Sequence, residues 1–303
     1  MKSQSAMEYL MTYGWVILVI AVVLGVLFQL GVFGSANLTP KAQPGACQVQ
    51  KTSASISLEG MCQGLEPQYV GSFGASAQTY MLASLDSALM TPGSLSRLTI
   101  SAWVYEQQNS DCEVGVAVLG PLSGGIASDW VYRFGVGGGG WSSPNPNEVL
   151  LEIFSPSGPW QTNMFSGPSV PYDSWTNIAA TYNGAVVNFY INGQPSGSTG
   201  YSSPMQPGAS NTVMIIGANP NSGCANSFPG YVSNLQVYNS SLSSSELLSL
   251  YQQGIGGAPI KPQNIVGWWP LNGNANDYSG SSDNGQDNGA GYVGSWTNGY
   301  IAP

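Results

Sequence analysis

Paired carboxylates are the first residues whose type and spacing could support a reaction. Glu148 and Glu152 lie four residues apart in the largely apolar run 148–154, and residues four apart on a β-strand point to the same face. Two carboxyl groups flanking a glycosidic bond can hydrolyse it. However, no acidic residue lies between these two, and the chain has no histidine to act as a base. We therefore expect no enzyme and no catalytic residues, with a glycoside hydrolase as an alternative.

A loop near the C-terminus offers oxygen ligands of the kind that calcium prefers. Asn274 and Asn276 precede Asp277, and Ser279 follows it. Amide, carboxylate, hydroxyl and backbone oxygens therefore converge in one tight loop. The pattern predicts a calcium site, and a solvated turn is the alternative.

Three tryptophans lie in segments rich in turn residues, namely Trp130, Trp141 and Trp160. An aromatic ring exposed on a loop offers a flat apolar surface on which a sugar ring can stack, so these are the candidate ligand-binding residues. Trp103 and Trp175 lie inside predicted strands, where packing in the core or on a sheet face is the expectation.

Four cysteines form two candidate disulfides. Cys47 and Cys62 flank a short loop, and Cys112 and Cys224 both lie in turn-rich stretches, without metal-type C-x-x-C spacing. Disulfides persist in oxidising compartments, and closing the first loop would stabilise the fold by about 3 kcal/mol. Free buried thiols are the alternative.

The charge balance excludes a nucleic-acid partner. The 303-residue chain has six Lys and Arg against 15 Asp and Glu, and a net charge of −9, whereas binding to phosphates needs clustered cations. Only 7% of residues are charged, so neutral polar groups must keep the surface soluble, which suits an extracellular protein. Asn37 and Asn239 each begin a sequon for N-glycosylation.

The elements that must position these residues are mostly strands. Residues 98–105 place Leu, Ile, Ala and Val on one face and Thr, Ser, Trp and Tyr on the other. The Asn-Gly pair at 183–184 is a strong hairpin signal. Many short strands at this spacing predict an all-β jelly-roll sandwich. A helical segment is expected at 243–252, capped by Ser244 or Ser245.

These strands resemble the laminin G-like, concanavalin A-type jelly roll. The resemblance rests on the blocks 101–104, 175–193 and 228–246. Segment 266–280 looks like the part that usually opens such a domain, although here it follows the body. We therefore expect 266–300 to complete a permuted sandwich, and a truncated second copy is the alternative.

The resemblance implies glycan binding, the usual work of this fold. Relatives often hold calcium near the 266–280 segment, partly through an acidic residue in the late Gly-Tyr-Val block, where this chain has Ser233 and Asn234. The glucanases that share the fold carry a Glu-x-Asp-x-x-Glu array, and segment 148–152 lacks its central Asp.

The N-terminal run from Leu10 to Phe33 is uncharged and long enough to cross a bilayer as a helix. A cleaved secretory signal peptide is the alternative. However, a carboxylate, Glu8, stands at the start of the run, where such a peptide carries positive charge.

The N-terminal sequence KSQSAMEYL resembles the class III signal of archaeal type IV pilins and archaellins. The resemblance implies that a prepilin peptidase cuts between Ser3 and Gln4 and leaves the apolar helix in place. A carboxylate at the edge of hydrocarbon needs a partner, and the new α-amino group of a neighbouring copy would provide one for Glu8.

We expect four parts in the chain: a leader at 1–3, a transmembrane or filament-core helix at 4–33, a neck with a disulfide loop at 34–66, and the sandwich at 67–303. The expected protein is a cell-surface pilin-like filament subunit or minor pilin that displays a glycan- or surface-binding domain. Its partners would be other pilin copies, the membrane, the peptidase and glycans. A non-polymerising membrane-anchored lectin-like protein is the alternative.

Overall fold

The computed structural model describes residues 6–29, 40–74, 79–83, 96–107, 114–122, 129–137, 147–155, 162–209, 211–219 and 226–303. The chain divides into two compact units, Met1–Pro40 and Lys41–Pro303. Each unit is described by itself.

The first unit contains the helix α1 (Ala6–Gln29), which includes Glu8. Its large apolar side chains from Tyr13 to Val26 are exposed, and Trp15 is 73% exposed. Nevertheless, none of the helices in the described residues combines the length and hydropathy that a membrane crossing requires. The predicted crossing at 4–33 is therefore not shown, because α1 ends at Gln29 and residues 30–33 lie outside the described ranges.

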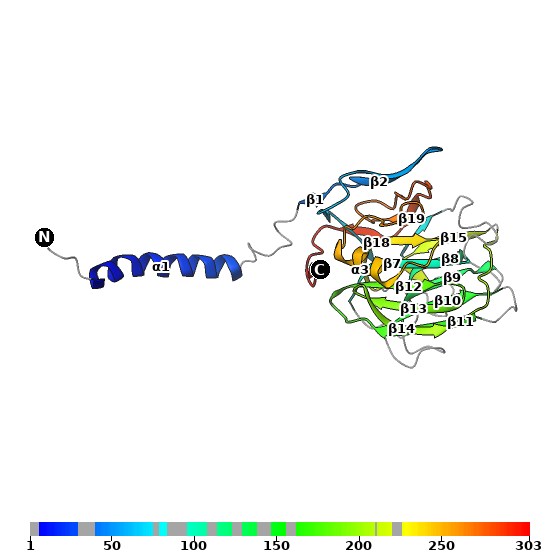
Figure 1. Ribbon diagram of the computed structural model, residues 1–303, viewed down its shortest axis with the longest axis horizontal. Coiled ribbons are helices and arrows are strands. Elements are labelled where there is room, and N and C mark those ends of the chain that lie inside the picture. Colours follow the sequence, from blue (N-terminus) through cyan, green and yellow to red (C-terminus); the bar gives the residue numbers. More distant parts are fainter. Residues whose placement is uncertain are drawn as a thin grey trace. The chain divides into compact units, whose positions relative to one another are not determined.

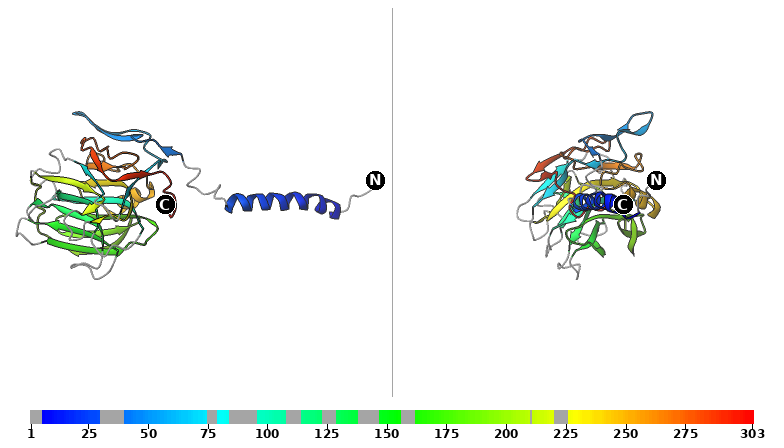
Figure 2. Two further views of the ribbon diagram at one scale, coloured as in Figure 1. Left: turned by 180° about the vertical axis from the view of Figure 1, so that it is seen from behind. Right: turned by 90° about the vertical axis from the view of Figure 1, so that its left-hand side faces the viewer.

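Two β-sheets form most of the second unit (Figures 1 and 2). The first has seven strands in the order β11-β10-β9-β8-β15-β6-β20. They are β6 (Tyr80–Ala83), β8 (Val114–Pro121), β9 (Tyr132–Gly137), β10 (Glu148–Phe154), β11 (Thr162–Ser169), β15 (Thr212–Ile216) and β20 (Gly285–Asn288).

The second sheet has eight strands in the order β14-β13-β12-β7-β18-β5-β21, with β19 also paired to β18. They are β5 (Val70–Phe73), β7 (Leu98–Glu106), β12 (Trp175–Tyr182), β13 (Val186–Ile191), β14 (Gln194–Gly200), β18 (Gly230–Tyr238), β19 (Ile265–Trp269) and β21 (Gly291–Val293).

The remaining elements are short. They are the pairs β1 (Lys41–Ala42) with β4 (Glu66–Pro67), β2 (Cys47–Lys51) with β3 (Ile56–Gly60) and β16 (Ala218–Asn219) with β17 (Asn226–Ser227), and the helix α3 (Ser244–Gln252). The predicted all-β sandwich is confirmed.

The core lies between the two sheets and follows the alternation expected of strands. In β7, Ile100 and Val104 are fully buried in the main core, while Trp103 and Tyr105 pack in a separate aromatic cluster on the opposite face. Burying each Ile or Val side chain in this way contributes about 1.5–3 kcal/mol. The face assignment predicted for residues 98–105 is thus confirmed.

The turn predicted at Asn183-Gly184 is present, and the helix predicted at 243–252 is present with its N-cap at a different residue. Gly184 has φ +92°, and the side chain of Asn183 accepts hydrogen bonds from the backbone of Ala185 and Val186, which closes the β12–β13 hairpin. The N-cap of α3 is Ser243 rather than Ser244 or Ser245, because only position 243 has the three-residue spacing to Glu246 that a capping box needs.

The C-terminal segment contributes strands to both sheets (orange and red in Figure 1). β19 pairs with β18, β20 with β6, and β21 with β5, all antiparallel. The edges next to β5 and β6 are therefore filled by the last 20 residues of the chain rather than by a segment that precedes the body.

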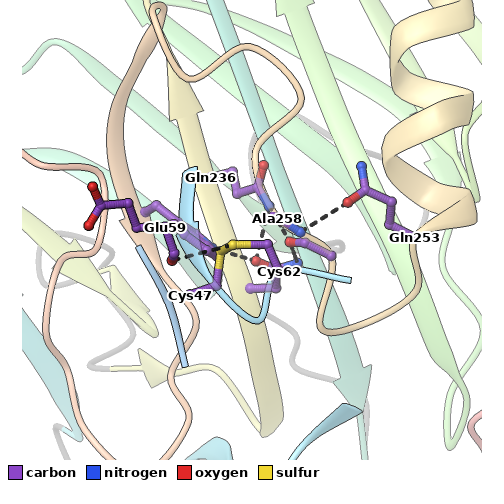
Figure 3. Close-up of a disulfide and its surroundings, with 9 residues drawn as sticks. Cys47, Glu59, Cys62, Gln236, Gln253 and Ala258 are labelled. Atoms are coloured by element: carbon purple, nitrogen blue, oxygen red, sulfur yellow. Dashed lines mark hydrogen bonds between the residues drawn. A yellow bond between two sulfur atoms is a disulfide. The ribbon is translucent and has the colours of Figure 1, made fainter. Parts of the chain in front are cut away.

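The neck contains the predicted disulfide hairpin. Cys47 and Cys62 are bonded, with their Cα atoms 4.9 Å apart, and the bridge lies beside Gln236 and Ala258 of the sandwich (Figure 3). Residues from Lys41 onward belong to the same compact unit as the sandwich, so the 41–66 part of the predicted neck packs on that domain. Cys112 and Cys224 lie outside the described residues.

Candidate functional site

Trp130 is not the exposed sugar platform that was predicted. Its side chain is 2% exposed and packs against Phe154, with ring centroids 6.1 Å apart. A Cβ atom at Gly120 would lie 2.2 Å from the indole, so this glycine makes room for the ring. Trp130 therefore has a packing role. Trp141 and Trp160 lie outside the described residues.

The Asp277 loop was tested for its fit to calcium. One carboxylate oxygen of Asp277 accepts hydrogen bonds from the backbone N–H groups of Trp268 and Ser279, each at 2.9 Å. The other accepts from the Ser279 hydroxyl at 2.8 Å and the Asp283 N–H at 3.1 Å. These four bonds use the lone pairs that a metal ion would need.

Two of the other predicted ligands, Asn274 and Ser279, also accept hydrogen bonds within the loop. Asn274 Oδ1 accepts from the Asn276 backbone N–H, which forms a local turn, and Ser281 N–H donates to the Ser279 hydroxyl. Among the described residues, no group of three or more His, Cys, Asp and Glu side chains could hold a metal. The residues present therefore do not fit the predicted calcium site.

A lysine from the neck supplies the positive charge beside this loop. Lys51 Nζ donates to the carbonyl of Ile265 and to the Ser281 hydroxyl, both at 3.0 Å. Lys51 is exposed as a whole residue, but partial burial of its ammonium lowers its pKa, and the charges of Asp277 and Asp283 oppose that shift. The ammonium of Lys51 thus offsets part of the negative charge of the Asp277 loop.

A pocket lies on the outer face of the seven-stranded sheet, where β8, β9 and β10 run side by side. Tyr132 and Phe134 of β9 point into the main core, so Arg133 and Gly135 point outward. The pocket is small, with a cavity volume of about 20 Å³, and is partly open to solvent. It is lined by Val114, Gly115, Arg133, Phe134, Gly135, Leu150, Glu152 and Asn219.

Two glycines at the bottom of this pocket, Gly115 and Gly135, leave it without side chains at those positions. A Cβ atom at Gly135 would lie 2.0 Å from the carbonyl of Val114, and one at Gly115 would lie 2.3 Å from the carbonyl of Ala218. Neither position can therefore carry a side chain without moving the backbone. The side chains of the polar groups beside them, Arg133 and Glu152, are largely buried, at 17% and 6% exposure.

Arg133 and Glu152 form an ion pair in the pocket wall. Their register pairs them across β9 and β10, and Arg133 Nη1 lies 2.9 Å from Glu152 Oε2. The guanidinium also lies over the ring of Trp130, with Cζ 4.3 Å from the centroid. This stacking holds the plane of the guanidinium. The pair presents donors and acceptors of fixed geometry.

Glu148 lies on the same outer face of β10 as Glu152, as the sequence spacing predicted, since Val149 and Leu151 point into the core. Beside it, Asn147 adopts φ +64°, and the Tyr172 hydroxyl donates to its side-chain carbonyl. Both carboxylates are largely buried, Glu148 at 9% and Glu152 at 5% exposure.

Sequence reasoning missed Arg133. As one of only six cations, it could have been noted, but its pairing with Glu152 depends on the β9–β10 register across the connection from 138 to 147. The predicted sequon residue Asn239 is exposed, and its Oδ1 accepts from Asn264 at 3.2 Å. Asn37, Ser3 and Gln4 lie outside the described residues.

Comparison with known families assigns the sandwich to a superfamily. Residues 77–248, more than half of the chain, match the sequence profile of the concanavalin A-like lectin/glucanases superfamily. No curated protein matches the sequence.

Solved structures show the same fold at low identity. A Bacteroides ovatus protein described as a candidate carbohydrate-binding protein is 16% identical, with a TM-score of 0.53, over 80% of this chain and 64% of that one. This chain thus spans less than two thirds of that protein.

Two further structures are less similar. A heptameric SAP-like pentraxin of Limulus polyphemus is 14% identical, with a TM-score of 0.48, over 74% of this chain and 93% of the pentraxin. The CBM40 module of a Ruminococcus gnavus IT-sialidase, bound to α2,3-sialyllactose, is 15% identical, with a TM-score of 0.42, over 52% of this chain and 83% of the module.

Proposed function

The chain belongs to the concanavalin A-like lectin/glucanases superfamily, and from that premise we propose that its sandwich is a lectin-like module that binds glycans outside the cell. The observation that carries the proposal is the Arg133–Glu152 pair, held rigidly in a pocket on the outer sheet face. Guanidinium donors and carboxylate acceptors side by side match the adjacent hydroxyls of a sugar ring. The Bacteroides ovatus protein, described as a candidate carbohydrate-binding protein, adds support.

The test removes the pair without leaving a buried charge. Arg133→Met combined with Glu152→Met keeps the side-chain volume, and such replacements of buried ion pairs are often neutral for stability. Binding of the full chain to an oligosaccharide panel is measured by calorimetry. We expect the double variant to bind at least about tenfold more weakly, the factor that 1.4 kcal/mol produces.

Arg97→Met is the matched control, because Arg97 is exposed and precedes β7 in the other sheet. It should bind as the wild type does. If the wild type binds no glycan, or the double variant binds equally well, the proposal is wrong. Hydrolysis of a bound glycan that is lost in Glu148→Gln would instead favour the hydrolase alternative.

A second proposal concerns α1. Its apolar side chains are exposed along residues 13–26, and such a surface favours burial in lipid or against copies of itself. The α1 segment would thus anchor the lectin-like module, with filament assembly as the stronger form of the proposal. The mature N-terminus tests the processing step, since a start at Gln4 supports it. Loss of filaments in Glu8→Ala with membrane association retained would support assembly.

A further inference from the structure

The charges around the pocket carry a further inference, which rests on the proposed glycan-binding function. A sugar that bears a carboxylate binds more strongly where an unpaired cation meets it. Arg133 is the cation among the residues that line this pocket, and it is already paired with Glu152 at 2.9 Å. The side chains of Arg133 and Glu152 are only 17% and 6% exposed, so water screens their attraction weakly.

The remaining cations of the described residues lie elsewhere. Lys41 pairs with Glu66 at 3.0 Å, Lys261 pairs with Glu246, and Lys51 is bonded to Ile265 and Ser281. Arg97 is exposed next to β7, in the opposite sheet. None of them lines the pocket.

Negative charge dominates the chain as a whole, while the lining of the pocket holds one cation and one carboxylate. Glu148 shares the outer face of β10 with Glu152, and the chain as a whole carries a net charge of −9. A carboxylated ligand would therefore meet a neutralised arginine in a negative field, which lowers both its affinity and its rate of approach.

We propose that the pocket selects uncharged glycans and that Glu152 is the residue that sets this selectivity. Glu152 does so in two ways: it cancels the charge of Arg133, and it offers carboxylate oxygens that accept hydrogen bonds from hydroxyl groups but repel acidic ones.

The experiment measures binding of the full chain to pairs of oligosaccharides that differ only in one sialic or uronic acid residue. The wild type should bind the uncharged member of a pair at least about tenfold more tightly. Glu152→Gln keeps the shape of the side chain but frees the charge of Arg133. It should shift the ratio of the two affinities by at least about tenfold toward the acidic member.

Glu66→Gln is the matched control, because it frees Lys41 in the same way on the short β1–β4 pair. It should leave the ratio unchanged. As a measurement that needs no variant, wild-type affinity for the uncharged member should be insensitive to salt, since screening acts on charged partners.

The outcomes separate the two proposals. If the wild type binds glycans but prefers the acidic member, or Glu152→Gln binds with an unchanged ratio, the selectivity proposal is overturned and the binding function stands. Strong salt dependence of binding to the uncharged member also overturns it. If the wild type binds neither member of any pair, the proposed function itself fails.

Discussion

At the residue scale, burial of the Glu106 carboxyl lowers the stability of this sandwich when the carboxyl is charged. It ends β7 on the inward side, two residues after the core residue Val104, and is 1% exposed. Its Oε2 finds no hydrogen-bond donor among the described residues. Burial raises the pKa of this carboxyl from 4.5 to about 7, because desolvation disfavours the charged form.

This shift makes stability depend on pH. The folded-state pKa lies above the unfolded value, so the contribution of Glu106 is fully present below about pH 4.5 and is lost as pH rises through about 7. The shift corresponds to about 3 kcal/mol. We expect Glu106→Gln to raise the free energy of unfolding by about this amount at pH 8, and to leave it almost unchanged at pH 4.

Denaturant unfolding of both proteins across this pH range measures the effect. Glu59→Gln, in the exposed strand β3, is the control and should follow the wild type. A Glu106→Gln protein whose stability falls with pH as steeply as the wild type would contradict the prediction.

Residue types alone predicted the packing of some side chains and not of others. The alternation in 98–105 was sufficient to separate Ile100 from Trp103, because a strand period of two is a local property. The burial of Trp130 was not predictable in this way, since it depends on Gly120 in the neighbouring strand β8 leaving space for the indole. Likewise, Asp277 has the composition of a metal ligand, but its partners come from residues 268, 279 and 283.

At the scale of elements, the disulfide hairpin β2–β3 packs on the C-terminal loop and is hydrogen-bonded to it. The backbone N–H of Val49 donates to the carbonyl of Tyr278 at 2.8 Å, and the Val49 side chain, 3% exposed, packs in a cluster with Tyr238 and Trp268. Lys51 adds its two hydrogen bonds one position further along the same face. The hairpin thus ties residues 47–51 to residues 265–281.

Replacing both Cys47 and Cys62 by serine should lower the free energy of unfolding by about 3 kcal/mol, because the unfolded chain regains the entropy of a loop of this length. Guanidinium unfolding followed by tryptophan fluorescence measures it. Ser53→Ala at the exposed tip of the hairpin is the control and should change stability by less than about 0.5 kcal/mol. Equal stability of the cysteine-free and wild-type proteins would show that the bridge constrains nothing.

The hairpins themselves were largely predictable. Asn183-Gly184 is a signal carried by two consecutive residues. The cap of α3 was predicted at Ser244 or Ser245, one or two residues after the actual N-cap Ser243. The Arg133–Glu152 pair was not predictable, since it arises from two strands whose register is set by the rest of the sheet. Local chemistry therefore indicated the elements, whereas the candidate site required their assembly.

At the scale of the whole molecule, the sandwich depends on its own C-terminus. Trp269 and Leu271 are fully buried in the main core, and Trp296 is 1% exposed in the aromatic cluster. Trp296 Nε1 donates to the carbonyl of Pro67, and the indole of Trp175 donates to the carbonyl of Trp296. The end of the chain thus joins β4 to the eight-stranded sheet.

A chain that ends at Asn264 would lose β19, β20 and β21 together. We expect it to lack a cooperative unfolding transition, because two sheet edges and several large core side chains would be missing. Near-ultraviolet circular dichroism during thermal unfolding is the measurement. Removing only the exposed residues Ile301–Pro303 is the control and should leave the transition in place. A cooperative transition in the shorter chain would mean that the body folds alone.

The position of β20 and β21 also sets the order of events during biosynthesis. Chains emerge from the ribosome N-terminus first, at about 5–20 residues per second. Strands β5 and β6 are made early, yet their partners β21 and β20 are made more than 200 residues later. Each sheet therefore lacks an edge strand until translation is nearly finished, so the sandwich is completed only when the last strands have left the ribosome.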